Sequence, residues 1–119
     1  MSLAGTRILL VEDEAIIAMT AEDMLDELGC VTAAIASTLE EALAAVEAGG
    51  FDLALLDINL NGRDSLPVAA RLKSAGTPFV FTTGYGSGGR GEEFDEVPLV
   101  TKPYRVADLA AAIGAALQV

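Results

Sequence analysis

Hydrophobic residues along this chain form five short runs, and longer segments with a different spacing separate them. The runs cover residues 7–11, 31–36, 51–56, 79–81 and 98–101. Short apolar runs that alternate with helical segments are typical of parallel strands buried on both faces. The pattern therefore predicts five parallel β-strands.

The segments between the runs place hydrophobic residues at helical spacing. They predict helices over residues 15–28, from 39 to about 48, over 66–74, and from about 106 to the C-terminal end. Gly29 matches a C-terminal stop for the first helix, and Ser37-Thr38-Leu39-Glu40 matches a capping box for the second. Five glycines between residues 84 and 91 weaken the helical pattern of 85–95, because an interior glycine costs about 1 kcal/mol relative to alanine. Residues 59–65 form a polar stretch without a predicted element.

Strands that alternate with helices indicate right-handed βαβ units, in which helices cover both faces of a parallel sheet. We therefore predict a doubly wound α/β fold with a five-stranded parallel sheet. The 119 residues are enough for one hydrophobic core, and a composition of 52% hydrophobic and 21% charged residues is typical of a globular protein. Residues 1–119 are accordingly predicted to form a single domain.

The composition argues against several kinds of site. With 18 acidic and 7 basic residues the net charge is −11, which repels phosphate backbones and argues against nucleic-acid binding. The absence of histidine excludes imidazole triads and imidazole metal sites, and the one cysteine, Cys30, is expected in the core. No apolar stretch approaches the roughly 18 residues of a membrane span, and the N-terminal residues lack a signal-peptide pattern. We expect a cytoplasmic protein that does not bind membranes.

Four of the hydrophobic runs end in polar residues of different chemical types. Glu12-Asp13 follows the first run, Asp57 the third, Thr82-Thr83 the fourth and Lys102 the fifth. In open parallel sheets, ligands bind outside the carboxyl ends of the strands. We therefore expect carboxylates, a hydroxyl and an ammonium group to meet at one edge of the sheet.

These groups match the needs of phosphoryl transfer to an aspartate. An aspartate can attack phosphorus once its repulsion from the phosphoryl oxygens is relieved, and Mg²⁺, which takes carboxylate, phosphate and water oxygens, relieves it. Glu12, Asp13 and Asp57 are the candidate ligands. Lys102 and Thr83 are candidates for contacts with the phosphoryl oxygens, as an ammonium charge and a hydroxyl donor.

The combined motifs resemble a known family. Glu12-Asp13, Asp57, Thr83-Gly84 and Lys102-Pro103-Tyr104 together are similar to the bacterial two-component response-regulator receiver domain. The resemblance covers nearly the whole chain and is specific as a set, although each motif alone is weak. It implies a flavodoxin-like sheet with strand order 2-1-3-4-5.

Carried over residue by residue, the resemblance implies a role for each candidate. Asp57 is the phosphoacceptor; Glu12, Asp13, Asp57 and the backbone carbonyl of Asn59 hold Mg²⁺; Thr83 and Lys102 contact the phosphoryl group. The peptide bond between Lys102 and Pro103 is expected to be cis. The implied donor is the phosphohistidine of a sensor histidine kinase or histidine phosphotransferase, and the output is contact with an unknown downstream protein. Such a domain is not an enzyme, beyond its part in its own aspartyl phosphorylation and dephosphorylation.

Two positions depart from the common receiver pattern. Leu99 stands where most receivers have a tyrosine or phenylalanine that rotates inward on phosphorylation, and residues 61–65 replace the usual turn that contains Pro-Gly. The stretch from Phe81 to Gly86 is similar to that of a subset of receivers that lack this aromatic residue. Tyr85 within the stretch is the switch candidate, with simple packing as the alternative.

Three alternatives account for parts of the pattern. A phosphatase of the haloacid-dehalogenase type also forms an aspartyl phosphate, but its Asp-x-Asp motif follows the first strand, and Asp57-Ile58-Asn59 lacks the second aspartate that acts as general acid. Residues 84–89 fit the dinucleotide fingerprint, but they follow the fourth strand instead of the first. A degenerate receiver that binds partners without phosphorylation is the third alternative. Leu99 favours it, whereas the acidic pair together with Asp57 and Lys102 opposes it.

Overall fold

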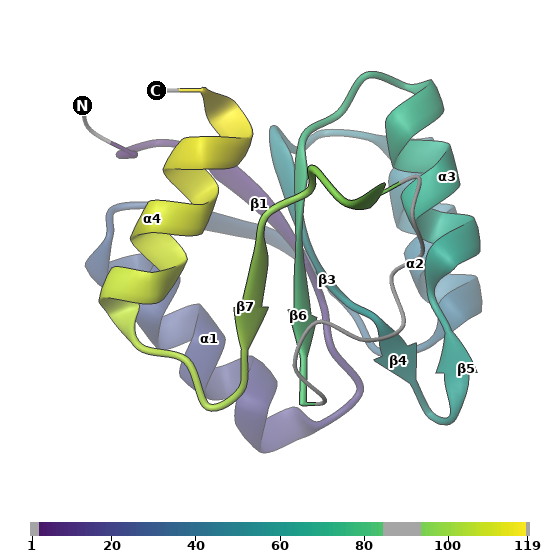
Figure 1. Ribbon diagram of the computed structural model, residues 1–119, viewed down its shortest axis with the longest axis horizontal. Coiled ribbons are helices and arrows are strands. Elements are labelled where there is room, and N and C mark those ends of the chain that lie inside the picture. Colours follow the sequence, from purple (N-terminus) through teal and green to yellow (C-terminus); the bar gives the residue numbers. More distant parts are fainter. Residues whose placement is uncertain (1–2, 85–93, 119) are drawn as a thin grey trace.

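The main feature of the fold is a parallel sheet of five strands. The structure is a computed structural model, and it describes residues 3–84 and 94–118. The strands of the sheet are β1 (Arg7–Val11), β2 (Val31–Ala36), β3 (Leu53–Asp57), β6 (Phe79–Thr83) and β7 (Leu99–Thr101). They pair in parallel in the order β2-β1-β3-β6-β7 (Figure 1). Counted along the chain within this sheet, the order is 2-1-3-4-5, which confirms the predicted topology.

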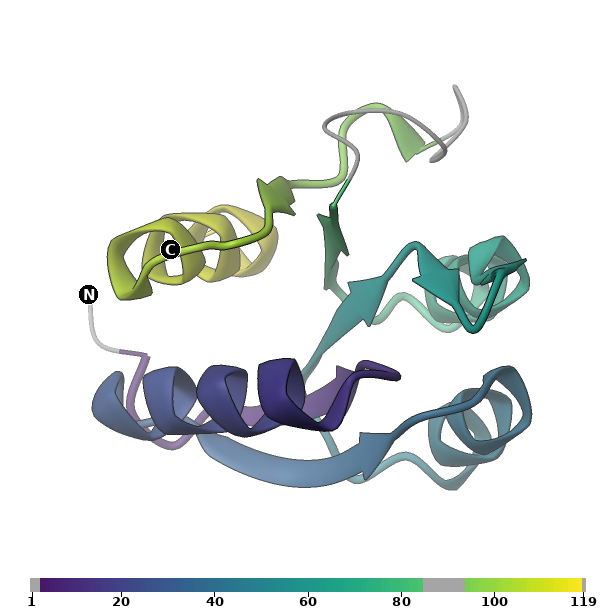
Figure 2. The ribbon, with the colours of Figure 1, turned by 90° about the horizontal axis from the view of Figure 1, so that it is seen from below.

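Four helices cover the two faces of the sheet. They are α1 (Ala15–Glu27), α2 (Leu39–Ala48), α3 (Leu66–Ser74) and α4 (Val106–Leu117). Helices α1 and α4 lie on one face, and α2 and α3 lie on the other (Figure 2). The doubly wound α/β architecture is therefore confirmed.

Each face of the sheet contributes to its own hydrophobic core. Ile8 and Leu10 of β1 point into the core under α1 and α4, whereas Leu9 and Val11 point into the core under α2 and α3. All four side chains are buried, and burial of such a side chain stabilises the fold by roughly 1.5–3 kcal/mol. Burial on both faces explains why the first hydrophobic run does not alternate with polar residues. Cys30 lies in the first of these cores, as predicted.

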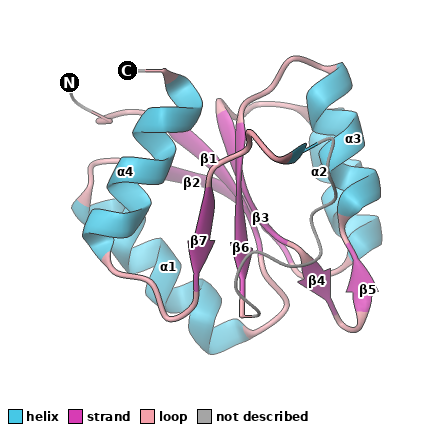
Figure 3. Ribbon diagram, viewed as in Figure 1, coloured by secondary structure: helices cyan, strands magenta, loops and turns pink. Residues whose placement is uncertain are grey.

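A small antiparallel hairpin follows the third strand of the sheet, where the sequence predicted only a polar stretch (Figure 3). Its strands are β4 (Asn59–Leu60) and β5 (Arg63–Asp64). The two residues of the turn have positive φ angles, 54° at Asn61 and 81° at Gly62. Asn-Gly between paired strands is the strongest short-range signal for a type I′ turn, so the hairpin was present as a pattern and was missed.

Several element boundaries differ from the predicted ones. Helix α2 is capped by Thr38, whose Oγ1 accepts a hydrogen bond from the Glu41 N–H at 3.1 Å, so the cap lies one residue later than predicted. Glu41 completes the cap by accepting a hydrogen bond from the backbone N–H of Ser37 at 2.8 Å. Strand β3 begins two residues later than expected and includes Asp57, and β6 continues through Thr83. Most of the segment 85–95 lies outside the described residues.

Within residues 3–84 and 94–118, no helix is both long enough and apolar enough to cross a bilayer.

Candidate functional site

The carboxyl ends of two neighbouring strands bring three carboxylates together. Glu12 and Asp13 directly follow β1, and Asp57 is the last residue of β3. One carboxylate oxygen from each of the three lies within 4.8 Å of the others. Two of them, Asp13 and Asp57, border a cavity of about 240 Å³, whose lining also includes Glu14, Asn59, Gly84 and Lys102. The strand ends thus form one acidic pocket.

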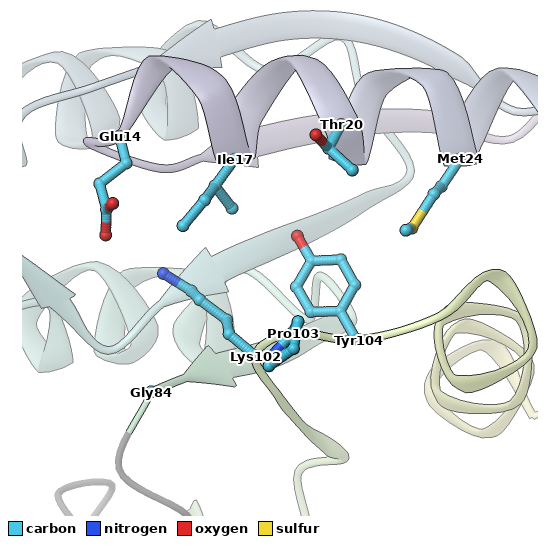
Figure 4. Close-up of a pocket in the computed structure, with 8 residues that line it drawn as sticks. All are labelled: Glu14, Ile17, Thr20, Met24, Gly84, Lys102, Pro103 and Tyr104. Carbon is cyan, nitrogen blue, oxygen red and sulfur yellow. The ribbon is translucent and has the colours of Figure 1, made fainter.

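Lys102 supplies the positive charge of this pocket. Its side chain reaches from the end of β7 toward the start of α1 (Figure 4), and the Lys102–Pro103 peptide bond before Tyr104 is cis, as expected. The ammonium Nζ lies 2.7 Å from Asp57 Oδ2 and 2.8 Å from Glu12 Oε1. The Lys102 backbone N–H donates to the carbonyl of Thr83 at 2.8 Å, which joins β7 to the end of β6. Lys102 therefore bridges two carboxylates that come from different strands.

Burial and charge raise the pKa values of both Glu12 and Lys102, but for different reasons. Loss of water around the Glu12 carboxyl raises its pKa to about 7, because the hydrogen bond from Lys102 offsets only part of the desolvation. Desolvation by itself lowers the pKa of Lys102, but the hydrogen bonds to Asp57 and Glu12 outweigh it and raise the pKa above its ordinary value. Lys102 is accordingly a permanent cation at neutral pH.

Each of the three carboxylates also accepts a hydrogen bond from a backbone N–H group. Glu14 donates to Glu12 Oε2 at 3.1 Å, and Asn59 donates to Asp57 Oδ1 at 3.1 Å. Asp13 Oδ2 accepts from Asn61 at 3.0 Å. Hydrogen bonds to an ionised carboxylate are stronger than those between neutral groups, so these contacts fix the directions of the three side chains.

The main chain around Asp57 is also held in place. The Ser65 hydroxyl donates to the Asp57 carbonyl at 2.5 Å, and the Ile58 N–H donates to the Thr82 carbonyl at 3.0 Å. Ser65 is completely buried just before α3 and its side chain makes no cap hydrogen bond to that helix. The sequence analysis missed this residue, because a serine before a helix normally predicts a cap.

Thr83, Leu99 and Tyr85 have different positions relative to the pocket. Thr83 is buried at the end of β6. The described residues that line the acidic cavity include its neighbour Gly84 but not Thr83 itself. Leu99 is half-buried in β7 and packs against the core under α2 and α3. Tyr85 lies outside the described residues, so its proposed switch role is still a prediction.

A second cavity of about 440 Å³ lies beside the pocket, between α1 and the segment after β7 (Figure 4). Its walls include Ile17 and Met24 of α1 and the ring of Tyr104, whose hydroxyl points toward the helix. Burial, with a contribution from the negative charge of Glu12, raises the pKa of Tyr104 to about 12. Tyr104 is thus an uncharged residue in the lining of the cavity next to the charged pocket.

The donor set of the acidic pocket fits a small divalent cation. Three carboxylates and one ammonium give a formal charge of −2, and like charges 4 Å apart repel by about 4 kcal/mol at an effective dielectric constant of about 20. A divalent ion balances this charge. Mg²⁺ prefers oxygen ligands and is usually bound by one or two carboxylates together with water and phosphate oxygens. The residues present, all with oxygen donors, meet that requirement.

Comparisons with known proteins agree on one family. Residues 8–114 match the family described as the response regulator receiver domain. The chain is 36% identical over 117 residues to the phyllosphere-induced regulator PhyR of Methylorubrum extorquens, covering 95% of this chain and 44% of PhyR. It is 30% identical over 111 residues to the transcriptional regulatory protein PdtaR of Mycobacterium tuberculosis, covering 90% of this chain and 54% of PdtaR. The chain therefore spans about half the length of these relatives.

A solved structure covers the chain almost end to end. The solution structure of SdrG from Sphingomonas melonis Fr1 superimposes with a TM-score of 0.86 at 43% sequence identity, covering 98% of this chain and 99% of SdrG.

Proposed function

This chain belongs to the response regulator receiver domain family, and on that premise we propose that Asp57 accepts a phosphoryl group from a partner's phosphohistidine. The observation that carries the proposal is the arrangement around Asp57. Its carboxylate is buried at the end of β3, lies 2.7 Å from the Lys102 ammonium, and shares the pocket with the carboxylates of Glu12 and Asp13. An acceptor needs a held carboxylate and nearby positive charge, and these contacts supply both.

In the proposed transfer, one carboxylate oxygen of Asp57 forms a bond to phosphorus. The bond between phosphorus and the imidazole nitrogen of the donor breaks, and its electron pair stays on that nitrogen. The hydrogen bond from the Asn59 N–H keeps the carboxylate directed, so little reorientation is needed before attack. Lys102, whose pKa is raised, stays protonated and moves its contact from Glu12 to a phosphoryl oxygen. We assign the second contact with the phosphoryl oxygens to the Thr83 hydroxyl.

Glu12, Asp13, Asp57 and the backbone carbonyl of Asn59 would hold Mg²⁺ in this pocket. When bound, the ion neutralises the charge that builds up on the phosphoryl oxygens. The Asn59 N–H points at Asp57, and in an extended strand the N–H and C=O of one residue point to the same edge. That geometry favours the Asn59 carbonyl as a ligand.

Partners follow from the same proposal. We propose a sensor histidine kinase or a histidine phosphotransferase as donor, and a downstream protein as the target of the phosphorylated form. A net charge of −11 disfavours direct contact of this domain with nucleic acid. The place of such an exchange is the cytoplasm, where kinases draw on ATP.

A small-molecule phosphodonor tests the function without knowledge of the kinase. Incubation of the protein with acetyl phosphate and Mg²⁺ is expected to add one phosphoryl group to its intact mass, because the pocket itself provides the acceptor and the stabilising charges. The same incubation with EDTA is expected to leave the mass unchanged. An unchanged mass in both samples contradicts the proposal and favours the degenerate receiver that binds partners without phosphorylation.

The switch assignment of Tyr85 has its own test. Thr83 directly precedes Gly84 and Tyr85, so closure of its hydroxyl on a phosphoryl group is expected to move the chain that follows. Leu99 cannot replace the rotating aromatic residue of other receivers. We therefore expect beryllofluoride, a phosphoryl mimic, to slow amide hydrogen exchange in residues 85–94. Exchange that is unchanged there, or slowed only elsewhere, contradicts the assignment.

A further inference from the structure

A backbone N–H group orients each of the three carboxylates of the pocket. The separation in sequence between the donor and the carboxylate differs among the three. Glu12 and Asp57 each accept from the residue two positions later. Asp13 accepts from Asn61, which is 48 positions away, at 3.0 Å. Two carboxylates are thus oriented by their own neighbours, and the third depends on the β4–β5 hairpin.

The hairpin is held in place over Asp13 from several directions. Asn61 and Gly62 adopt positive φ angles, and the Gly62 N–H donates to Asn59 Oδ1 at 2.9 Å inside the turn. The Asn61 side-chain amide donates to the Ser37 carbonyl at 3.3 Å, and Leu60 is anchored in the core at 1% exposure. These contacts fix the point at which the Asn61 N–H meets Asp13.

The hydrogen bond leaves Asp13 with one oxygen for a metal ion. Asp13 Oδ2 is engaged by Asn61, while Oδ1 makes no hydrogen bond within residues 3–84 and 94–118. Mg²⁺ requires nearly ideal octahedral geometry and keeps several waters, which suits a carboxylate that binds through one oxygen. Ca²⁺ is larger, takes six to eight ligands and often binds both oxygens of a carboxylate. An Asp13 with one oxygen engaged is therefore better matched to the smaller ion.

We propose that the Asn61-Gly62 turn positions Asp13 through the Asn61 N–H, and thereby sets both the Mg²⁺ affinity of the pocket and its preference for Mg²⁺ over Ca²⁺. The inference rests on the proposed function, since it concerns the metal site of the phosphorylation pocket. Asn61 is a positioning residue in this account: it touches Asp13 and not the ion. Groups that orient a metal ligand typically change metal affinity by about 10–100-fold when they are removed.

The test compares two substitutions at one position. Asn61→Pro removes the N–H and cannot adopt the positive φ, whereas Asn61→Gly keeps both and removes only the side-chain contact with Ser37. Dissociation constants for Mg²⁺ and for Ca²⁺ are measured from the shifts of backbone amide resonances during titration. Asn61→Pro is expected to lose about tenfold or more in Mg²⁺ affinity and less in Ca²⁺ affinity. Asn61→Gly is expected to keep the wild-type values for both ions.

Two further variants separate positioning from general damage to the hairpin. Arg63→Gln removes the 2.7 Å ion pair with Glu40 but leaves the Asn61 N–H in place, so its Mg²⁺ affinity is expected to be unchanged. Asn61→Val retains the N–H but disfavours positive φ, and it is expected to weaken Mg²⁺ in the same direction as proline. Circular dichroism and thermal unfolding in EDTA show whether each variant is folded. If the proline variant does not fold, the valine variant replaces it in the test.

The outcomes distinguish this inference from the function on which it rests. If the wild-type protein binds Mg²⁺ but the proline and valine variants bind it equally well, the positioning role is wrong and the proposed function stands. Equal losses in the glycine and proline variants also overturn it, because the N–H is then not the cause. If the wild-type protein binds no Mg²⁺ in this pocket, both the inference and the proposed metal site are wrong.

Discussion

Asp57→Asn is expected to abolish phosphorylation by acetyl phosphate in the presence of Mg²⁺. The amide that replaces the carboxylate is almost isosteric, but it has no negatively charged oxygen to attack phosphorus. It also removes the negative charge of one of the three clustered carboxylates, which weakens the metal site. Intact mass spectrometry is expected to show one added phosphoryl group in the wild-type protein and none in the variant.

The matched control for this experiment is a substitution of an aspartate just before the same strand. Asp52 is an exposed aspartate that immediately precedes β3, whereas Asp57 is the buried residue at its end. Asp52→Asn removes an equal charge and is expected to leave the extent of phosphorylation at the wild-type level. A phosphoryl group that still appears on Asp57→Asn identifies another acceptor and contradicts the role of Asp57.

Lys102→Met is expected to lower the free energy of unfolding by about 3 kcal/mol in the absence of divalent ions. Removal of one partner from a buried ion pair leaves an uncompensated charge and typically costs about 3–5 kcal/mol. Here the ammonium is shared by Glu12 and Asp57, whose side chains are 2% and 5% exposed. Protonation of Glu12, whose pKa is raised to about 7, relieves part of the cost, so we expect the lower end of the range. Urea unfolding in EDTA measures the change.

Two comparisons show whether the lost positive charge causes the expected loss of stability in Lys102→Met. Lys73→Met removes the other lysine of the chain, which is exposed and lies 5.5 Å from the centre of the Phe94 ring, and it is expected to cost less than about 1 kcal/mol. The double variant Lys102→Met/Glu12→Gln removes one of the stranded carboxylates and is expected to recover part of the lost stability. Equal losses in the Lys73 and Lys102 variants, or no recovery in the double variant, contradict this account of the ion pairs.

Much of the fold could be predicted because its signals are local. Strands β1 and β2 begin and end where the hydrophobic runs do, since a run without alternation requires burial on both faces. The predicted strand order is the observed one, and Cys30 is buried as expected. The errors occurred where two local signals compete. Thr38 rather than Ser37 caps α2, and the Asn61-Gly62 turn lies in a polar stretch for which no element was predicted.

The sequence by itself determined which chemical groups stand at the carboxyl ends of the strands, and the parallel order of the strands then requires Glu12, Asp57 and Lys102 to meet. It also determined two hydrogen bonds, because the N–H groups that orient Glu12 and Asp57 lie two residues further along. Only the tertiary structure decided how the charges pair. Lys102 spans two strands, Ser65 holds the Asp57 carbonyl, and Asn61 reaches Asp13 across 48 positions. Contacts of this kind depend on distances between elements that are far apart in the chain, and no local pattern of residues carries those distances.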